Sequence, residues 1–142
     1  MKNIILCDID GTVANNDHRQ NILKEYQDWD IFFSELVNDE PIFKVIDLIK
    51  LNYKNGFKVV FVTGRPERYR KMTSDWLNNY FDFKIEILMR PDADKRNKLI
   101  IKKDMLENFN YSQQIKKIYE NDIDLIKLWE ELGYEVVNVG SI

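Results

Sequence analysis

The sequence predicts an α/β fold in which a five-stranded parallel sheet is covered by helices on both faces. Five short apolar runs recur along the chain, and continuous apolar strands of this kind are typical of a sheet that is buried on both sides. Helical patterns separate these runs, as expected for alternating strands and helices. The length of 142 residues fits one domain, so we expect a single domain over residues 1–142.

The first half of the chain holds two of these strands. Residues 4–7 form the first apolar run and residues 58–63 the second. Between them, residues 16–40 are polar and aromatic, which predicts a small insertion. Apolar residues then follow a helical period from Ile42 to Ile49, and Asn55-Gly56 supplies the signal that ends this helix.

The second half continues the alternation of helices and strands. The predicted elements are a helix over 67–80, a strand over 85–89, a charged loop over 90–97, a helix over 98–109, a strand over 115–119, a helix over 122–132 and a strand over 135–139. Gly133 is the expected stop of the last helix.

Composition excludes several classes of protein. Lys and Arg number 21 against 24 Asp and Glu, a net charge of −3, which does not indicate a strongly basic surface for wrapping a duplex. Cys7 is the single cysteine, so no intramolecular disulfide forms, and this suits a reducing compartment. No run reaches the roughly 18 apolar residues of a membrane span. We therefore expect a cytoplasmic protein without membrane contacts.

Polar and charged residues collect where the predicted strands end. The carboxyl ends of parallel strands meet at one edge of the sheet, where ligands bind in open α/β folds. An edge that gathers acids, a hydroxyl and cations is costly to assemble unless a cation and an anion bind there. The residues are Asp8 and Asp10 after the first strand, Thr63, Gly64 and Arg65 after the second, Arg90 after the third, Lys102 on the next helix, and Glu120 after the fourth.

The first of these clusters carries a family resemblance. Asp8-Ile9-Asp10-Gly11-Thr12 after an apolar strand resembles the first motif of the haloacid dehalogenase-like hydrolases. Thr63 matches the second motif of that superfamily, and Lys102 and Glu120 stand where the third and fourth would fall. The resemblance implies a Rossmann-like three-layer domain with a small cap insertion at about residues 16–40.

Longer stretches are similar to the phosphatase domain of polynucleotide kinase-phosphatase. The similar segments are DIDGTVANNDHR from Asp8, FVTGRPERYR from Phe61, MRPDADKRNKLIIKK from Met89, and IKLWEELGYEV near the C-terminus. No G-x-x-x-x-G-K-[ST] motif of a kinase occurs in this sequence. The resemblance implies a stand-alone phosphatase module. The sequence leaves open whether a separate kinase or ligase works beside it in an end-repair pathway.

The resemblance also implies a chemical role for each motif. Asp8 would attack phosphorus and form an aspartyl-phosphate, and Asp10 would act as general acid and base. Thr63 and Lys102 would hold the phosphoryl oxygens. Mg²⁺ would lie between Asp8, the backbone carbonyl of Asp10 and Glu120, because small hard cations prefer oxygen ligands. Lys103 is the alternative to Lys102, since the helical pattern alone sets the register there.

Substrate contacts are expected from the remaining residues at this edge. By resemblance, Arg19 and Arg65 contact substrate, with Gly64 and Arg90 beside them, and a guanidinium suits a phosphate through two parallel hydrogen bonds. Close relatives usually carry two adjacent aspartates after the fourth strand, where this chain has Glu120-Asn121. Asp122 is therefore an alternative to Glu120 at the metal.

Three functions compete at this stage. The leading prediction is a polynucleotide 3′-phosphatase that acts on a 3′-phosphorylated DNA or RNA end, because a small cap leaves the site open to large substrates. A nucleotidase or other small-molecule phosphatase uses the same chemistry. The third is a module that binds phosphate ends without turnover, since Asn121 cannot supply a charge to the metal site. The sequence leaves DNA against RNA, and 3′ against 5′ ends, open.

Overall fold

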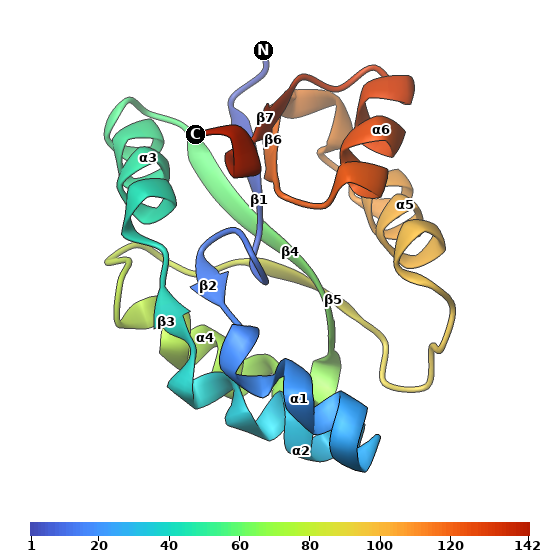
Figure 1. Cartoon of the computed structure of the whole chain (residues 1–142). Coiled ribbons are helices and arrows are strands. Elements are labelled where there is room, and N and C mark those ends of the chain that lie inside the picture. The colour runs from blue at the N-terminus through green and yellow to red at the C-terminus, as the bar shows by residue number, and fades with distance from the viewer.

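The computed structural model describes residues 1–142, and strands and helices alternate along the chain (Figure 1). The sheet strands are β1 (Ile4–Asp8), β4 (Lys58–Pro66), β5 (Ile87–Arg90), β6 (Ile115–Glu120) and β7 (Val136–Asn138), and the helices between them are α3 (Phe43–Lys54), α4 (Arg70–Asn78), α5 (Lys98–Asn108) and α6 (Ile123–Glu131). Short 3₁₀ turns are η2 (Glu67–Tyr69), η3 (Ser112–Gln114) and η4 (Val139–Ser141).

The five sheet strands are parallel and lie in the order β5-β4-β1-β6-β7. Strand β1 is central, and its residues from Ile4 to Asp8 pair with β4 from Lys58 to Val62. The predicted five-stranded parallel sheet is therefore confirmed. Because β1 lies between β4 and β6, the residues that follow these three strands come together at one edge.

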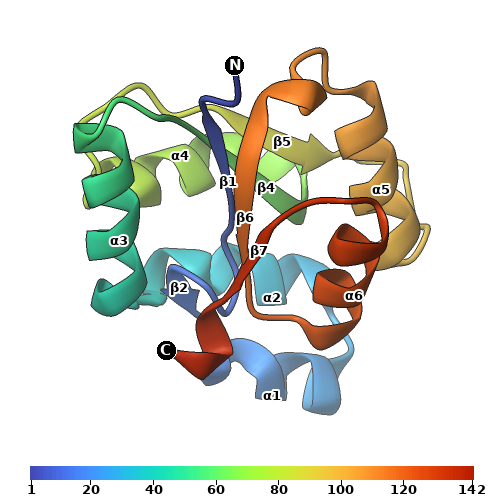
Figure 2. The same cartoon turned by 90° about the horizontal axis from the view of Figure 1, so that it is seen from above.

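Helices cover both faces of the sheet, and alternate residues of β1 separate two apolar cores. Ile5 and Cys7 pack with α3 and α4, whereas Ile4 and Leu6 pack with α5 and α6. Figure 2 shows α3 and α4 on one side of the strands and α5 and α6 on the other. This two-sided burial is why the strands read as continuous apolar runs rather than as alternating patterns.

The insertion predicted over residues 16–40 forms a small helical cap. It holds α1 (Asp17–Tyr26), α2 (Trp29–Ser34) and the 3₁₀ turn η1 (Glu35–Asn38). The short antiparallel pair β2 (Ala14–Asn15) and β3 (Glu40–Pro41) closes its base. In Figure 1 the cap lies beyond the carboxyl ends of β1 and β4, so it stands over the edge where Asp8 lies.

Some predicted boundaries shift. The predicted helix over 67–80 is a 3₁₀ turn followed by α4 from Arg70, because β4 continues in extended conformation to Pro66. The third sheet strand begins at Ile87 rather than at residue 85. In this fold no helix combines the length and apolar character that crossing a bilayer requires.

Candidate active site

Asp8 lies at the edge formed by the carboxyl ends of β1, β4 and β6, which we call the catalytic edge because the expected catalytic residues gather there, and it is almost fully buried. The ammonium of Lys102, near the start of α5, donates to Asp8 Oδ1 at 2.7 Å, and the hydroxyl of Thr12 donates to Oδ2 at 3.2 Å. Lys102 is itself buried, whereas Lys103 points away and pairs with Glu107. Of the two lysines considered from the sequence, Lys102 is therefore the one that reaches Asp8.

The loop after Asp8 turns sharply at Gly11. Its φ of +79° lies in the left-handed region, which favours glycine. A Cβ at this position would also lie 2.3 Å from Nδ2 of Asn121, so any other residue would have to displace the Asn121 side chain. The turn lets Asp8 and Asp10 face the same edge although they are two residues apart.

Asp10 is held by two buried arginines. Arg65 donates from Nη2 to Asp10 Oδ1 at 2.8 Å and from Nε to Oδ2 at 3.2 Å, and Arg19 Nη2 donates to Oδ1 at 2.8 Å. Burial alone would raise the pKa of Asp10, but Arg65 and then Arg19 outweigh it and lower that pKa. Asp10 nevertheless keeps 29% of its side chain exposed, so it can reach a bound molecule.

The guanidinium groups of Arg19 and Arg65 are both occupied by contacts within the protein and are not free to bind a phosphate in this structure. Arg19 Nη1 donates to the carbonyl of Phe32, and its guanidinium lies 4.4 Å from the Phe32 ring centroid. Arg65 Nη1 donates to the hydroxyl of Thr73. Direct substrate contact by either arginine stays a prediction, and the geometry supports a different role, the orientation of Asp10.

Asp39 anchors both arginines and was not singled out in the sequence. Its side chain is fully buried and accepts hydrogen bonds from Arg19 Nε at 2.8 Å, Arg19 Nη2 at 2.9 Å and Arg65 Nη2 at 3.2 Å. The His18 ring lies 2.7 Å from Oδ1. No motif marks Asp39. The one available signal is its place at the end of the cap, where the chain returns to the sheet.

The end of β4 supplies Thr63 and Gly64. The Thr63 hydroxyl is buried and accepts the backbone N–H of Arg65 at 3.1 Å, and no acceptor in the chain receives its proton, which leaves it available to a phosphoryl oxygen. Arg90 donates to the carbonyls of Gly64, Asp94 and Arg96. These bonds tie the charged loop to the end of β4, and substrate contact by Gly64 and Arg90 stays a prediction.

The acidic residues at the end of β6 do not form a pair of side chains that both point toward Asp8. Glu120 is fully buried, and its oxygens accept from the backbone N–H groups of Asn121 and Asp122 and from the Trp129 indole. Asp122 caps α6 and pairs with Lys98. The carboxamide of Asn121, rather than Asp122, lies beside the Thr12 hydroxyl that contacts Asp8, with Asn121 Oδ1 at 3.3 Å from that hydroxyl.

The side chains around Asp8 carry more negative than positive charge, which favours binding of a cation. Lys102 pairs with Asp8 at 2.7 Å and lies 3.7 Å from Glu120, so one ammonium serves two buried carboxylates. Burial and Glu120 raise the pKa of Asp8 against the opposing effect of Lys102. The pKa of Lys102 is raised by the two carboxylates in spite of its burial. The excess of negative charge and the oxygen donors of Asp8 and Asn121 suit Mg²⁺, although no three Asp, Glu, His or Cys side chains form a metal cluster.

We expect the Asp8→Asn variant to unfold at a higher temperature than the wild type when both are metal-free at pH 8. Because the pKa of Asp8 is raised in the fold, its ionisation opposes folding as pH rises through that pKa. A neutral amide removes this cost, and a rise in Tm of about 4 °C would correspond to about 1 kcal/mol. Thermal denaturation in the presence of a chelator measures the shift.

The same measurement at low pH is the control. As pH falls toward the pKa of Asp8 in the unfolded chain, about 3.9, the wild-type carboxyl becomes mostly protonated in both states, so the difference in Tm should shrink to a small fraction of its value at pH 8. An equal or lower Tm for Asp8→Asn at pH 8 would contradict the assignment of Asp8 as a strained buried charge.

Comparison with known proteins identifies a family that matches nearly the whole chain. Residues 2–141 match the family described as "Polynucleotide kinase PNKP phosphatase domain". A protein of Autographa californica nuclear polyhedrosis virus, described as a bifunctional polynucleotide kinase/RNA ligase, is 27% identical over 136 residues. The match covers 94% of this chain and 18% of the viral protein. The chain thus spans less than a fifth of that relative.

Solved structures share the fold. A chain of the Pnkp1/Rnl/Hen1 RNA repair complex is 26% identical with a TM-score of 0.78, over 96% of this chain and 42% of that one. A second Pnkp1/Rnl/Hen1 structure has a TM-score of 0.80 at 24% identity, over 98% and 46% of the two chains. A phosphatase from Clostridium difficile, with a TM-score of 0.62 at 14% identity, shares the fold over 96% of this chain and 84% of its own.

The fold, the motif residues and the family match agree. Asp8 and Thr63 lie in strands β1 and β4, Asp10 follows β1, and Lys102 reaches Asp8 from α5, so the residues that carry the resemblance come together at one edge of the sheet. The match over residues 2–141 leaves only the chain ends outside it. The chain belongs to the family of phosphatase domains of polynucleotide kinase-phosphatase, within the haloacid dehalogenase-like hydrolases.

Proposed function

We propose that this chain is a Mg²⁺-dependent polynucleotide 3′-phosphatase that works through an aspartyl-phosphate on Asp8. The observation that carries the proposal is the juxtaposition of Asp8, with Lys102 at 2.7 Å, and Asp10, held by two arginines at the same edge. A nucleophile, a positive partner and an oriented acid–base group are the parts that phosphoryl transfer through a carboxylate needs. Membership of a polynucleotide phosphatase family supports the substrate class.

In the first half of the reaction, a carboxylate oxygen of Asp8 attacks phosphorus while the bond to the 3′-oxygen breaks. Lys102 offsets the negative charge of the phosphoryl group, and the free Thr63 hydroxyl proton is placed to donate to a phosphoryl oxygen. The departing 3′-oxygen takes a proton from Asp10 and leaves as a hydroxyl. The products of this step are the aspartyl-phosphate and a nucleic acid with a free 3′ end.

In the second half, Asp10 accepts a proton from a water molecule, and the hydroxide attacks phosphorus and displaces Asp8. The two arginines favour the ionised Asp10 that this step requires. For the first half Asp10 must be protonated, and the charge of a bound phosphate dianion raises its proton affinity. The site therefore favours proton donation while substrate is bound and proton acceptance after the 3′ end has left.

Mg²⁺ is proposed as the cofactor, with Asp8, the backbone carbonyl of Asp10 and Glu120 as the ligands expected by resemblance. When bound, Mg²⁺ would neutralise the charge between the carboxylate and the phosphate. The contacts of Glu120 with Trp129 and with two backbone N–H groups mean that it must turn to reach a metal directly. Asn121, whose carboxamide already faces the Thr12 hydroxyl beside Asp8, is the side chain that would complete the site without such a change.

The decisive experiment is phosphate release from a 3′-phosphorylated oligonucleotide in the presence of Mg²⁺. We expect the wild type to release phosphate and Asp8→Asn to release none, because an amide cannot form the acyl-phosphate. A matched oligonucleotide with a 5′-phosphate tests which end is processed. Release by Asp8→Asn at the wild-type rate would contradict the covalent mechanism.

The competing function is hydrolysis of free nucleotides on the same chemistry. A competition between the 3′-phosphorylated oligonucleotide and a nucleoside 3′-phosphate separates the two. A higher kcat/KM for the free nucleotide would replace the 3′-end function with that of a nucleotidase. Failure of wild type on every phosphate ester, combined with retained binding of phosphate ends, would favour the non-catalytic module.

Partners are proposed from the same relatives. The matched chains of the repair complexes and the viral kinase/ligase are longer than this chain, and this chain covers 18% to 46% of them. We propose that a kinase or ligase activity works alongside this domain on nucleic-acid ends. A 3′-hydroxyl end, the product proposed here, is a substrate that such an activity can take over.

A further inference from the structure

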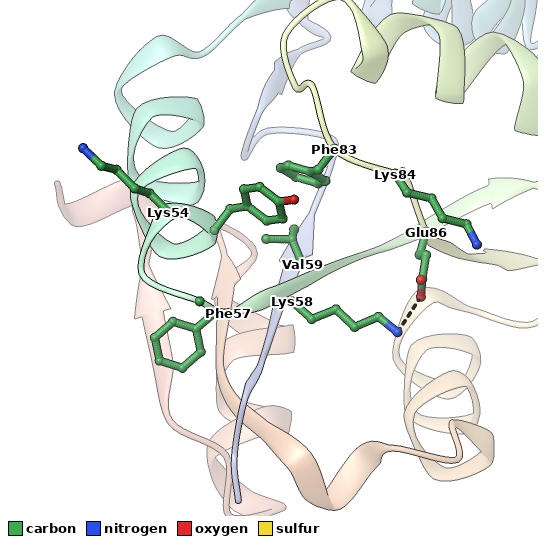
Figure 3. A pocket seen from close by; sticks show the side chains of 9 residues that line it. Lys54, Phe57, Lys58, Val59, Phe83, Lys84 and Glu86 are labelled. Atoms are coloured by element: carbon green, nitrogen blue, oxygen red, sulfur yellow. Dashed lines mark ion pairs between the residues drawn. The ribbon is translucent and has the colours of Figure 1, made fainter.

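A second surface lies at the edge of the sheet opposite Asp8. The C-terminal end of α3, the start of β4 and the segment before β5 line an open pocket of about 550 Å³ (Figure 3). A neighbouring cavity of about 350 Å³ shares three of its lining residues and adds Lys50. We call the two together the distal surface, and the residues that matter on it are Lys50, Tyr53, Lys54, Lys58, Phe83 and Lys84.

Aromatic rings on the distal surface form a stack that runs from the core to solvent. Phe61 is buried in β4, and the Phe83 ring lies nearly parallel to it at a centroid distance of 6.5 Å and an angle of 9°. Tyr53 stacks on Phe83 at 4.5 Å and 27°, and it remains 47% exposed. The stack on Phe83 orients the Tyr53 ring, and the residue as a whole stays exposed, as expected for an aromatic side chain on which a base can stack.

Positive charge surrounds this stack. Lys58 pairs with Glu86 at 3.2 Å, as the dashed line in Figure 3 marks, but Lys50, Lys54 and Lys84 have no carboxylate partner within 4 Å. The two cavities are lined by four lysines against two carboxylates, Asp82 and Glu86. In a chain with a net charge of −3, this concentration of unpaired lysines favours an anionic ligand.

We propose that the distal surface binds single-stranded nucleic acid, with a base stacked on Tyr53 and phosphates held by Lys54 and Lys84. Basic side chains combined with an exposed aromatic ring are the elements that single-strand binding uses, and neither needs a particular sequence. The proposal rests on the proposed function in that the ligand is the body of the same nucleic acid whose end reaches Asp8. The nine residues of β4 separate the distal surface from the edge where Asp8 lies by about 30 Å. Only a nucleic acid several nucleotides long can therefore reach both.

The test measures binding of a fluorescent single-stranded oligonucleotide of about 20 nucleotides without a terminal phosphate. Anisotropy titrations compare wild type with Tyr53→Ala and with the double variant Lys54→Gln/Lys84→Gln. Base stacking and charge predict a loss of affinity of about tenfold for each at low salt. The slope of log affinity against log salt should fall by about 1.4 in the double lysine variant.

A matched control is Lys71→Gln/Lys103→Gln, which removes two exposed lysines from α4 and α5 and should leave the affinity unchanged. Steady-state kinetics with a short and a long substrate test the distal surface separately from the proposed phosphatase activity. The distal variants should keep the wild-type kcat and KM on a nucleoside 3′-phosphate but raise KM on the 3′-phosphorylated oligonucleotide.

Two results would overturn the proposal. Equal affinities of wild type and both distal variants would show that the oligonucleotide binds elsewhere. No binding by wild type at low salt, while phosphate is released from oligonucleotides, would show that catalysis does not use nucleic-acid binding at the distal surface. Binding that depends on Tyr53 in a chain that releases no phosphate would support the proposal and contradict only the catalytic one.

Discussion

Lys102→Met should lower kcat/KM for phosphate release by about 10²–10³-fold, the loss typical of removing one electrostatic contact to a transition state. The variant should also lose about 3 kcal/mol of unfolding free energy, because Asp8 and Glu120 would be left as two buried carboxylates without their shared cation. Chemical denaturation and steady-state kinetics measure the two effects. Methionine fills a similar space, so the change tests the charge rather than the packing.

Two further variants distinguish the loss of the Lys102–Asp8 ion pair from a non-specific loss of stability. Lys103→Met, on the exposed side of the same helix, should change stability by less than about 1 kcal/mol and leave kinetics unchanged. The double variant Lys102→Met/Asp8→Asn should be more stable than Lys102→Met alone, because it removes one of the two stranded carboxylates. Strictly additive free energies would mean that Lys102 and Asp8 are not coupled.

Asp39→Asn should lower kcat about 10²-fold with a much smaller change in KM. The amide keeps the shape of the side chain but no longer balances Arg19 and Arg65, whose nitrogens approach Asp39 at 2.8–3.2 Å. The arginines would then shift, and Asp10 with them, and small displacements of a reacting group cost rate rather than affinity. Initial rates measured at concentrations of 3′-phosphorylated substrate from below KM to saturation determine kcat and KM separately.

Asp30→Asn is the matched control for this prediction. Asp30 also lies in the cap and pairs with an arginine, Arg68, but both side chains are exposed. Such pairs contribute at most about 1 kcal/mol, so kcat should be unchanged. If Asp39→Asn lowers Tm but leaves kcat at the wild-type value, Asp39 supports the cap alone and does not position Asp10.

Much of the catalytic edge could be predicted because it depends on local pattern. A buried strand in a two-sided parallel sheet is continuously apolar, so its end is visible in the sequence, and the residue that follows must lie at the carboxyl edge. Asp8 and Thr63 are found in this way, and the structure has them where β1 ends and within the extended end of β4. Lys102 is suggested by the family resemblance, and the helical pattern that sets its register did not separate it from Lys103.

The partners of these residues could not be predicted, because they are chosen across the fold. Asp39 lies 20 residues from Arg19 and 26 from Arg65, and nothing in the pattern of any one segment links the three. Glu120 and Asn121 are neighbours in sequence, but the end of β6 turns one toward the Trp129 indole and the other toward Thr12. Which acid faces the reacting phosphate is therefore a question of side-chain direction.

By itself the sequence determined the layers, the strand ends and the residue types at the catalytic edge, because burial and periodicity act over a few neighbouring residues. Only the tertiary structure decided that Arg19 and Arg65 bind Asp10 rather than stand free, and that Asp39 anchors them. Buried charges must find partners wherever the fold brings opposite charges together. Ion pairing in the core is thus a property of the whole packed chain, and no single stretch of sequence contains it.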